Sequence, residues 1–314
     1  MATSDYKAIK IARRRFLKGL GLLSILAAMR PVNIWAKNTA IITRRIPVSG
    51  EKIPAIGMGS WLTFGIGNEP EKLATRVAIL RSFFAGGGYL IDSSPMYGNA
   101  EKVIGECLAT IQPFSLFAAT KVWTSGWQQG IRQMETSRRL WGLPRFDLLQ
   151  IHNLLDWKVH IETLKAWKQE GKVRYIGVTT SHGRRHDELE MIMRTQPIDF
   201  VQFTYNILDR EAEARLLPLA KDKGIAVIVN RPFQGGELFP YTVRKNLPGM
   251  ASELQIENWA QFFLKYIISH PAVTCAIPAT SQVQHMQENI AACYGPLPDK
   301  AMRAEMQKAF KPFL

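Results

Sequence analysis

The segment Phe146-Asp147-Leu148-Leu149-Gln150-Ile151 is a short, mostly apolar run of the kind that forms a buried strand. Patterns with the amphipathic period of a helix precede it over residues 127–141 and follow it over residues 158–170. Gly142 and Gly171, at positions typical of helix ends, close the two helical patterns. This part of the chain therefore predicts a strand between two helices.

The same unit, a strand followed by a helix, repeats through the rest of the chain. Strict alternation indicates a parallel sheet, and eight units favour a closed (β/α)8 TIM barrel, an α/β fold. The alternative, a Rossmann-type sheet, would need a third glycine after Gly57-Met58-Gly59 and a helix beginning there. We expect strands at Ile53–Gly59, Tyr89–Asp92, Leu116–Lys121, Phe146–Ile151, Arg174–Val178, Phe200–Phe203, Ala226–Val229 and Val273–Ile277. We expect helices at 70–85, 100–110, 127–141, 158–170, 185–194, 211–223 and 254–269, and one from about 282.

A short β-hairpin is predicted ahead of the barrel. Ile41–Arg45 and Lys52–Ala55 flank Ser49-Gly50, a typical turn pair, so we expect the hairpin to cap one end of the barrel. The chain has 314 residues, of which 46% are hydrophobic, and this is enough for one large core. We therefore assign residues 37–314 to one barrel domain.

Residues 1–36 have the composition of an export signal. Arg13-Arg14-Arg15-Phe16-Leu17-Lys18 precedes the apolar stretch Gly19–Met29, which is too short to span a bilayer, and Ala36 is a candidate cleavage site. The arrangement resembles the bacterial twin-arginine (Tat) signal, with Arg13 and Arg14 as the pair. The alternative is an ordinary basic N-terminal helix. The resemblance implies that the Tat machinery exports the folded protein, with its cofactor already bound, to the periplasm.

The formal net charge of +14 suggests nucleic-acid binding at first sight. Residues 1–36 alone, however, carry seven basic residues and one acidic residue. After residue 45 there is no run of lysine or arginine with interleaved aromatic residues. We therefore expect no nucleic-acid partner, and the remaining positive charge suits a cofactor that carries phosphates.

The cysteines Cys107, Cys275 and Cys293 are too few and too widely spaced for a disulfide framework or a metal site. We expect them to be buried as small apolar side chains. A bridge between Cys275 and Cys293 in an oxidising compartment is the alternative.

Four titratable side chains of four different types lie at the ends of predicted strands. Asp92 ends the second strand, Tyr97 lies in the loop after it, Lys121 ends the third strand and His152 follows the fourth. Catalytic groups of this fold lie at the carboxyl ends of the strands, so we expect the four to meet at one mouth of the barrel. Taken singly, each has an ordinary structural explanation, such as a helix cap for Asp92.

The chemistry of these four residues is complementary. Reduction of a carbonyl by hydride needs a proton for the developing alkoxide, and a tyrosine, with a reference pKa of about 10, needs help to supply it. The ammonium of Lys121 would lower the pKa of Tyr97, and Asp92 would hold that lysine in place and protonated. His152 would hydrogen-bond the carbonyl oxygen and orient the substrate. The set predicts general-acid catalysis by Tyr97.

With these residues in place, the sequence from about Ile41 to its end resembles the aldo-keto reductase family. The resemblance implies a nicotinamide cofactor bound without a Rossmann fold and hydride transfer to an aldehyde or ketone. It also implies that Asp92, Tyr97, Lys121 and His152 are the catalytic residues. The matching segments are Ile53–Gly59, Asp92–Gly98, Lys121, Asp147–Asn153, Gly171–Val178, Gln202–Asn206, Ile277-Pro278 and Glu288-Asn289.

The positions that the resemblance assigns to the cofactor match less well. Thr179 and Thr180 stand where the family usually has Ser-Asn to hold the nicotinamide carboxamide, and Gln202 is retained. Asn230 stands where an aromatic ring usually stacks on the nicotinamide. Arg231 adds a positive charge for the pyrophosphate.

The last matching segment bears on the choice between NADP(H) and NAD(H). Relatives that prefer NADPH commonly carry Lys or Arg there for the 2′-phosphate, whereas this chain has Ala279, Ser281, Gln282 and His285. We expect NADP(H) in preference to NAD(H), because it is the family default, with the preference weakened by this segment. The cofactor contacts implied in all are Thr179, Thr180, Gln202, Asn230, Arg231, Thr280, His285, Glu288 and Asn289.

The predicted function is the NAD(P)H-dependent reduction of a small carbonyl substrate by a monomeric periplasmic enzyme. A non-catalytic, cofactor-binding regulatory barrel is the alternative, as the potassium-channel β subunits of this family largely are; lyase or isomerase chemistry is a further one. The complete set of four argues against a non-catalytic barrel, while Asn230 argues mildly for altered cofactor use. Aromatic residues in or beside the loops predict an apolar pocket: Trp61, Phe64, Trp123, Trp127, Trp157 and Phe233.

Overall fold

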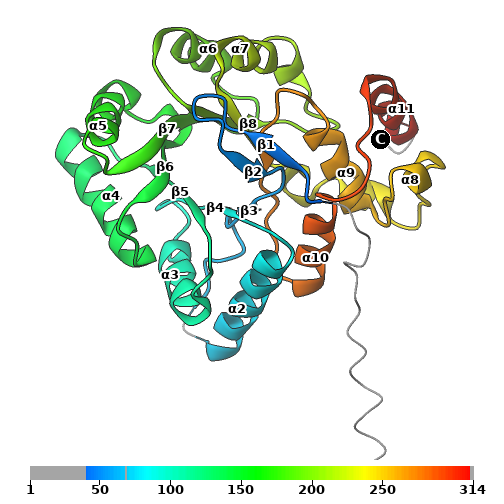
Figure 1. The fold of residues 1–314 in the computed structure, drawn as a ribbon, viewed down its shortest axis with the longest axis horizontal. Coiled ribbons are helices and arrows are strands. Elements are labelled where there is room, and N and C mark those ends of the chain that lie inside the picture. The colour runs from blue at the N-terminus through cyan, green and yellow to red at the C-terminus, as the bar shows by residue number, and fades with distance from the viewer. Residues whose placement is uncertain (1–39, 68, 312–314) are drawn as a thin grey trace, which may run out of the picture. The chain divides into compact units, whose positions relative to one another are not determined.

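The computed structural model describes residues 40–67 and 69–311, and it contains a barrel of parallel strands ringed by helices (Figure 1). Each strand from β3 to β10 is hydrogen-bonded to the next in chain order. The barrel closes where Ile56 bridges Ala276 in parallel and Gly59 N donates to Pro278 O over 3.0 Å. The (β/α)8 prediction is confirmed. The strands are β3 (Met58–Gly59), β4 (Leu90–Asp92), β5 (Phe117–Val122), β6 (Phe146–Ile151), β7 (Val173–Thr179), β8 (Phe200–Thr204), β9 (Ala226–Asn230) and β10 (Cys275–Ala276).

The helices between the strands cover the outside of the barrel (Figure 1). For two of the predicted helices, the predicted first residue is wrong. Residues 254–269 begin a helix only at Trp259, because the Asn258 side chain accepts a hydrogen bond from Gln261 N. Residues 211–223 split into a 3-10 turn and a helix. The helices are α2 (Pro70–Ala85), α3 (Ala100–Ile111), α4 (Trp127–Trp141), α5 (Trp157–Gln169), α6 (His186–Thr195), α7 (Leu216–Lys223), α8 (Met250–Glu253), α9 (Trp259–Ile268), α10 (Val283–Ala291) and α11 (Lys300–Phe310).

The barrel interior is apolar towards the amino ends of the strands and polar towards their carboxyl ends. Successive residues of a strand point to opposite faces, so every second residue enters the interior. On β4, Leu90 belongs to the apolar interior and Asp92 to the polar layer. On β6, Leu148 belongs to the apolar interior and Gln150 to the polar layer. The interior apolar cluster is Ile46, Ile53, Leu90, Phe117, Ala119, Leu148, Tyr175, Phe200, Ala226, Ile228, Cys275 and Ile277. The interior-facing residues of the strands therefore form an apolar layer near the amino ends and a polar layer near the carboxyl ends.

The predicted hairpin is present as β1 (Thr43–Arg45) and β2 (Lys52–Pro54), paired antiparallel. Ile46 and Ile53 join the interior cluster, so the hairpin closes the amino-terminal end of the barrel (Figure 1). The first predicted strand, Ile53–Gly59, is therefore wrong as a single strand. Its first residues belong to the hairpin, and only Met58–Gly59 is a strand of the barrel.

Helix α11 was not predicted from the sequence. Its amino end is capped by Asp299, which accepts a hydrogen bond from Met302 N over 2.8 Å. Arg303 attaches the helix through a hydrogen bond to Glu213 Oε1 over 2.8 Å. The helix therefore packs on the side of the barrel, next to the segment between β8 and α7.

Cys107, Cys275 and Cys293 are buried and free, as expected, and the alternative bridge between Cys275 and Cys293 is not formed. Across residues 40–67 and 69–311, no helix has the length and apolar character needed to cross a membrane. In the same part of the chain, no group of three or more His, Cys, Asp or Glu side chains could hold a metal ion. The predicted export signal, residues 1–36, lies outside the described residues.

Candidate active site

A buried ion pair forms the base of the site. Lys121, at the end of β5, has no exposed surface, and Asp92, at the end of β4, is 2% exposed. Lys121 Nζ donates hydrogen bonds to Asp92 Oδ2 and, over 2.8 Å, to Ser93 O. Burial alone would lower the pKa of Lys121, but Asp92 and Tyr97 reverse this, and the pKa is raised. The lysine therefore remains a cation.

The second oxygen of Asp92 is held by two amides. Gln150 and Gln202 each donate from Nε2 to Asp92 Oδ1, over 3.0 and 3.2 Å. Gln150 was missed in the sequence, although it lies two residues before His152 and so shares its side of β6. Both carboxylate oxygens are thus bonded inside the barrel, which fixes the plane of the carboxylate.

Tyr97 lies in the loop after β4, and Lys121 Nζ is 5.4 Å from the centroid of its ring. Burial raises the pKa of Tyr97, the charge of Lys121 lowers it, and the net shift is upward. The prediction that Lys121 lowers the pKa of Tyr97 is right about the lysine's own contribution, but burial outweighs it. The phenol therefore keeps its proton at neutral pH, which a general acid requires.

His152 faces Tyr97, with ring centroids 5.7 Å apart and ring planes at 87°. Its Nδ1 is 2.7 Å from Ser94 Oγ, and that hydroxyl accepts a hydrogen bond from Met96 N over 3.2 Å. Since the serine oxygen is already an acceptor, its proton is free to go to Nδ1. This favours the tautomer of His152 that carries its proton on Nε2. Burial, followed by the charge of Lys121, lowers the pKa of His152 to about 3, so the ring is neutral.

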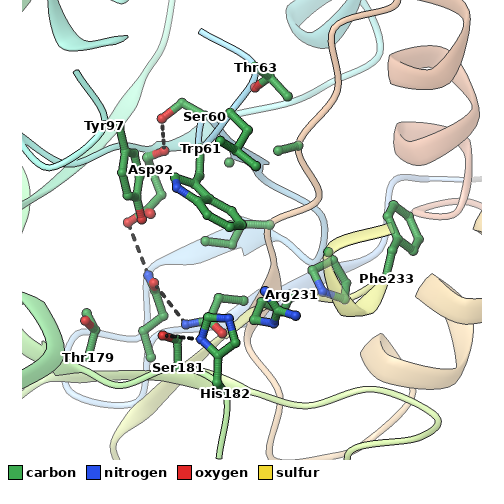
Figure 2. Close-up of a pocket in the computed structure, with 18 of the residues that line it drawn as sticks. Ser60, Trp61, Thr63, Asp92, Tyr97, Thr179, Ser181, His182, Arg231 and Phe233 are labelled. Carbon is green, nitrogen blue, oxygen red and sulfur yellow. Dashed lines mark hydrogen bonds between the residues drawn. The ribbon is translucent and has the colours of Figure 1, made fainter. Parts of the chain in front are cut away.

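A cavity of about 290 Å³ opens at the carboxyl ends of the strands. Asp92, Tyr97 and His152 line it, whereas Lys121 does not. Figure 2 shows Tyr97 and Asp92 on one side of the cavity and Arg231 and Phe233 on the other. The structure therefore brings together the four catalytic candidates, with Lys121 buried behind the tyrosine.

Five of the predicted cofactor positions also line this cavity: Thr179, Thr180, Gln202, Asn230 and Arg231. Two of them offer polar atoms that no described residue binds, namely Thr180 Oγ1 and Arg231 Nε. Buried polar atoms without a partner are costly, so their occurrence in residues that line a cavity favours a polar ligand there. A hydroxyl donor and a guanidinium fit the carboxamide and the phosphates of a nicotinamide nucleotide.

Asn230 is fixed by its neighbours. Its Oδ1 accepts a hydrogen bond from Thr204 Oγ1, and its Nδ2 donates to Thr180 O, both over 2.8 Å. The position that the family resemblance gives to an aromatic ring therefore holds an amide that links β8, β9 and the loop after β7.

The segment 231–236, after β9, forms one wall of the cavity. Arg231 and Gln234 have positive φ angles of 48° and 54°, and the φ angles of Gly235 and Gly236 are also positive, at 74° and 102°. Asn206 stabilises this backbone, because its Nδ2 donates to Arg231 O over 3.1 Å and to Gln234 Oε1 over 2.7 Å. A Cβ at Gly236 would meet nothing within 4 Å, which leaves space for a ligand beside the backbone.

The remaining predicted cofactor positions are Thr280, His285, Glu288 and Asn289, and none of them lines the cavity. Thr280 Oγ1 accepts a hydrogen bond from Gln282 N, His285 is exposed and Asn289 is buried. Ala279, from the same segment, does line the cavity. These four residues lie beyond the cavity's edge, on the loop after β10 and on α10.

Two polar residues of the cavity wall were not predicted from the sequence. Ser181 and His182, after β7, line the cavity and are paired by a 2.9 Å hydrogen bond (Figure 2). Of the predicted aromatic residues, Trp61 and Phe233 line the cavity. The other four do not: Phe64 and Trp157 are buried, and Trp123 and Trp127 are exposed.

Comparison with known proteins defines the class that this fold and site belong to. The family model described as "Aldo/keto reductase family" matches residues 55–309, so the chain belongs to the aldo/keto reductase family. The methylglyoxal reductase YeaE of Escherichia coli is 30% identical over 260 residues, which cover 79% of this chain and 88% of that protein. An NADH-specific methylglyoxal reductase of Escherichia coli is 24% identical over 313 residues, covering 79% of this chain and 93% of that protein.

Solved structures show the same fold. An aldo/keto reductase from Klebsiella pneumoniae, solved in complex with NADP and acetate, superimposes with a TM-score of 0.73 at 24% sequence identity. The match covers 86% of this chain and 96% of that one. This likeness supports the barrel fold.

Proposed function

We propose that this protein reduces a small aldehyde or ketone to an alcohol with a nicotinamide nucleotide, and that Tyr97 is the general acid. The observation that carries the proposal is the contact between Tyr97 and the buried Lys121–Asp92 pair at the cavity wall. Membership of the aldo/keto reductase family and the methylglyoxal reductases among its relatives support the same reaction.

The residues would divide the reaction as follows. The nucleotide supplies the hydride when it is bound. Tyr97 gives its proton to the carbonyl oxygen, and the cation behind it stabilises the phenolate that remains. Asp92 keeps Lys121 charged and in place. Neutral His152, with its proton on Nε2, donates a hydrogen bond that orients the same carbonyl oxygen.

The nucleotide would be held by the cavity-lining residues whose buried polar atoms have no partner among the described residues. Thr180, with Gln202 beside it, suits the carboxamide, and Arg231 suits the pyrophosphate. One similar structure is a complex with NADP and one relative is NADH-specific, and we propose NADP(H) in preference to NAD(H). Thr280, His285, Glu288 and Asn289 are proposed as more distant contacts to the adenosine half.

Nucleotide oxidation tests the proposal. Purified protein is mixed with NADPH or NADH and a panel of aldehydes and ketones that includes 2-oxoaldehydes, and absorbance loss is followed. We expect turnover that is lost in Tyr97→Phe and kept in Tyr241→Phe, a matched change at an exposed tyrosine. If the intact protein turned over no carbonyl and Tyr97→Phe behaved identically, a non-catalytic, nucleotide-binding role would replace this proposal. Equal affinity for the two nucleotides would show that the 2′-phosphate is not recognised.

We also propose that residues 1–36 are a Tat signal, that residues 37–314 form the exported barrel, and that the enzyme acts as a periplasmic monomer. The support is the sequence around Arg13 and Arg14. Replacing both by lysine is expected to trap the protein in the cytoplasm, and fractionation of cells would show this. Unchanged arrival in the periplasm would refute the assignment. Gel filtration of the mature protein tests whether it is monomeric.

A further inference from the structure

Glu101 is a buried acid outside the four catalytic candidates. It lies in the first turn of α3, four residues after Tyr97, and is 3% exposed. Its Oε1 accepts a hydrogen bond from Thr120 Oγ1 over 2.6 Å, and its Oε2 accepts one from Ser137 Oγ over 2.7 Å. Burying a carboxyl group costs free energy unless it is hydrogen-bonded, so these two hydroxyls are the groups that make the position tenable.

The bond to Thr120 connects the two segments that carry the catalytic pair. Thr120 immediately precedes Lys121 on β5, and the two side chains point to opposite faces of the strand. Thr120 faces the helices, and Lys121 faces the barrel interior. Glu101 is therefore a fixed link between the start of α3, which continues the loop of Tyr97, and the strand that holds Lys121.

Close packing of α3 on α4 keeps Glu101 within reach of these partners. A Cβ at Gly105 would lie 1.8 Å from Leu140 O, so only glycine allows the two helices to approach this closely. Gly105 is one turn after Glu101 on α3, and Leu140 is about one turn after Ser137 on α4. The same contact therefore places Ser137 opposite Glu101.

We propose that Glu101 is a positioning residue for the reduction, acting through Thr120 to hold Tyr97 at the correct distance from Lys121. It lines no part of the cavity, so it acts without touching substrate or nucleotide. The inference rests on the proposed function of Tyr97 as the acid. The electrostatics agree with this geometry: burial raises the pKa of Glu101 overall, and the charge of Lys121 is among the smaller contributions that oppose the rise.

The test compares variants of the full chain, each assayed per nucleotide-binding site. Glu101→Ala and Thr120→Val break the link, Thr120→Ser keeps the hydroxyl, and Glu106→Gln changes a half-exposed acid on the same helix. Displacement of a reacting group by about 1 Å can lower the rate by about 100-fold. We therefore expect kcat to fall about 10- to 100-fold in the first two variants, with KM for the nucleotide within about twofold. Thr120→Ser and Glu106→Gln should match the wild type.

Two further measurements separate positioning from a merely structural role. With deuterated nucleotide, the isotope effect on kcat should increase in Glu101→Ala and Thr120→Val, because the chemical step becomes slower. The pH profile of kcat should also shift, because Lys121 no longer lies against Tyr97. Reduced thermal stability with unchanged kcat, isotope effect and pH profile per binding site would overturn the proposal. If Glu101→Ala did not fold, the comparison of kcat between Thr120→Val and Thr120→Ser would still test the proposal.

The outcomes also distinguish this inference from the proposed function. A wild-type protein that reduces no carbonyl overturns both. An active wild type whose rate is unchanged by Glu101→Ala and Thr120→Val overturns only the role of Glu101.

Discussion

Lys121 Nζ lies 5.4 Å from the centroid of the Tyr97 ring, and the lysine side chain has no contact with solvent. The distance is short enough for a cation–π attraction and for a direct effect on the phenol. Because Asp92 forms an ion pair with the same ammonium, both groups can remain charged inside the barrel. The same buried lysine therefore contributes to the stability of the barrel and lies beside the tyrosine that is proposed to donate the proton.

The first prediction concerns this ion pair. Lys121→Met should lower the free energy of unfolding by about 3–5 kcal/mol, because it leaves the carboxylate of Asp92 buried without a cation. The reductase activity should be lost as well. Urea unfolding and nucleotide oxidation measure the two effects. Lys72→Met, which removes an exposed partner of Glu69, should change the free energy of unfolding far less. An equal, small effect of both changes would contradict the buried pair.

The second prediction concerns the acid stability of the fold. The pKa of His152 is lowered from 6.5 to about 3 in the folded protein, so the unfolded chain takes up a proton first as the pH falls. Stability that is present above pH 6.5 is lost progressively toward pH 3. Between pH 6.5 and 5 this amounts to about 2 kcal/mol.

His152→Gln should remove this contribution to the dependence of the free energy of unfolding on pH, measured by urea unfolding at pH 6.5 and pH 5. His285→Gln, at an exposed position, is the matched control. Some slope should persist in both, since the pKa of His270 is also lowered by burial, to about 4. A slope that is the same in His152→Gln as in the wild type would contradict the buried neutral ring.

The third prediction concerns the unpartnered hydroxyl of Thr180. Thr180→Val keeps the shape of the side chain and removes a buried oxygen that no described residue binds. The protein without nucleotide should be as stable as the wild type or more stable, whereas the Kd of the nucleotide should rise about 10-fold. Melting curves and fluorescence titration measure the two quantities. A loss of stability with unchanged nucleotide affinity would show that the hydroxyl serves the fold instead.

The fourth prediction concerns the contact of α3 with α4. Gly105→Ala would bring a methyl group to 1.8 Å from Leu140 O, so the helices must separate. Overpacking of this kind costs about 1–3 kcal/mol or more, and kcat should fall with it if the Glu101 link is displaced. Gly249→Ala is the control, because a Cβ there meets nothing within 4 Å. Equal stability of the two variants would contradict the close packing.

Much of the barrel could be predicted because its signals are local. The run Phe146–Ile151 was predicted to the residue, and most other strands within one or two residues at each end. The first strand failed because Ile53–Gly59 is a continuous apolar run in the sequence. Its division between hairpin and barrel depends on which distant partner each half meets, β1 for one and β4 for the other.

The site could be predicted only in part. Asp92, Tyr97, Lys121 and His152 were predicted as catalytic candidates because each stands at a strand end or in the loop after it, a position that is visible in the sequence. Gln150, Ser94 and Asn206 were missed, since an amide or a hydroxyl in a strand or turn has no signal of its own. Their importance comes from bonds to Asp92, to His152 and to the backbone of Arg231.

The sequence by itself determined the alternation of strands and helices, the barrel that follows from it, and the four strand-end residues with their complementary chemistry. The tertiary structure alone decided the net direction of the Tyr97 pKa, the neutral state of His152, and the link of Glu101 through Thr120 to the strand of Lys121. The physical reason is that period and residue type are properties of neighbours along the chain. Burial and electrostatic coupling are properties of neighbours in space, and residues such as Glu101 and Thr120, 19 positions apart, become neighbours only when the barrel closes.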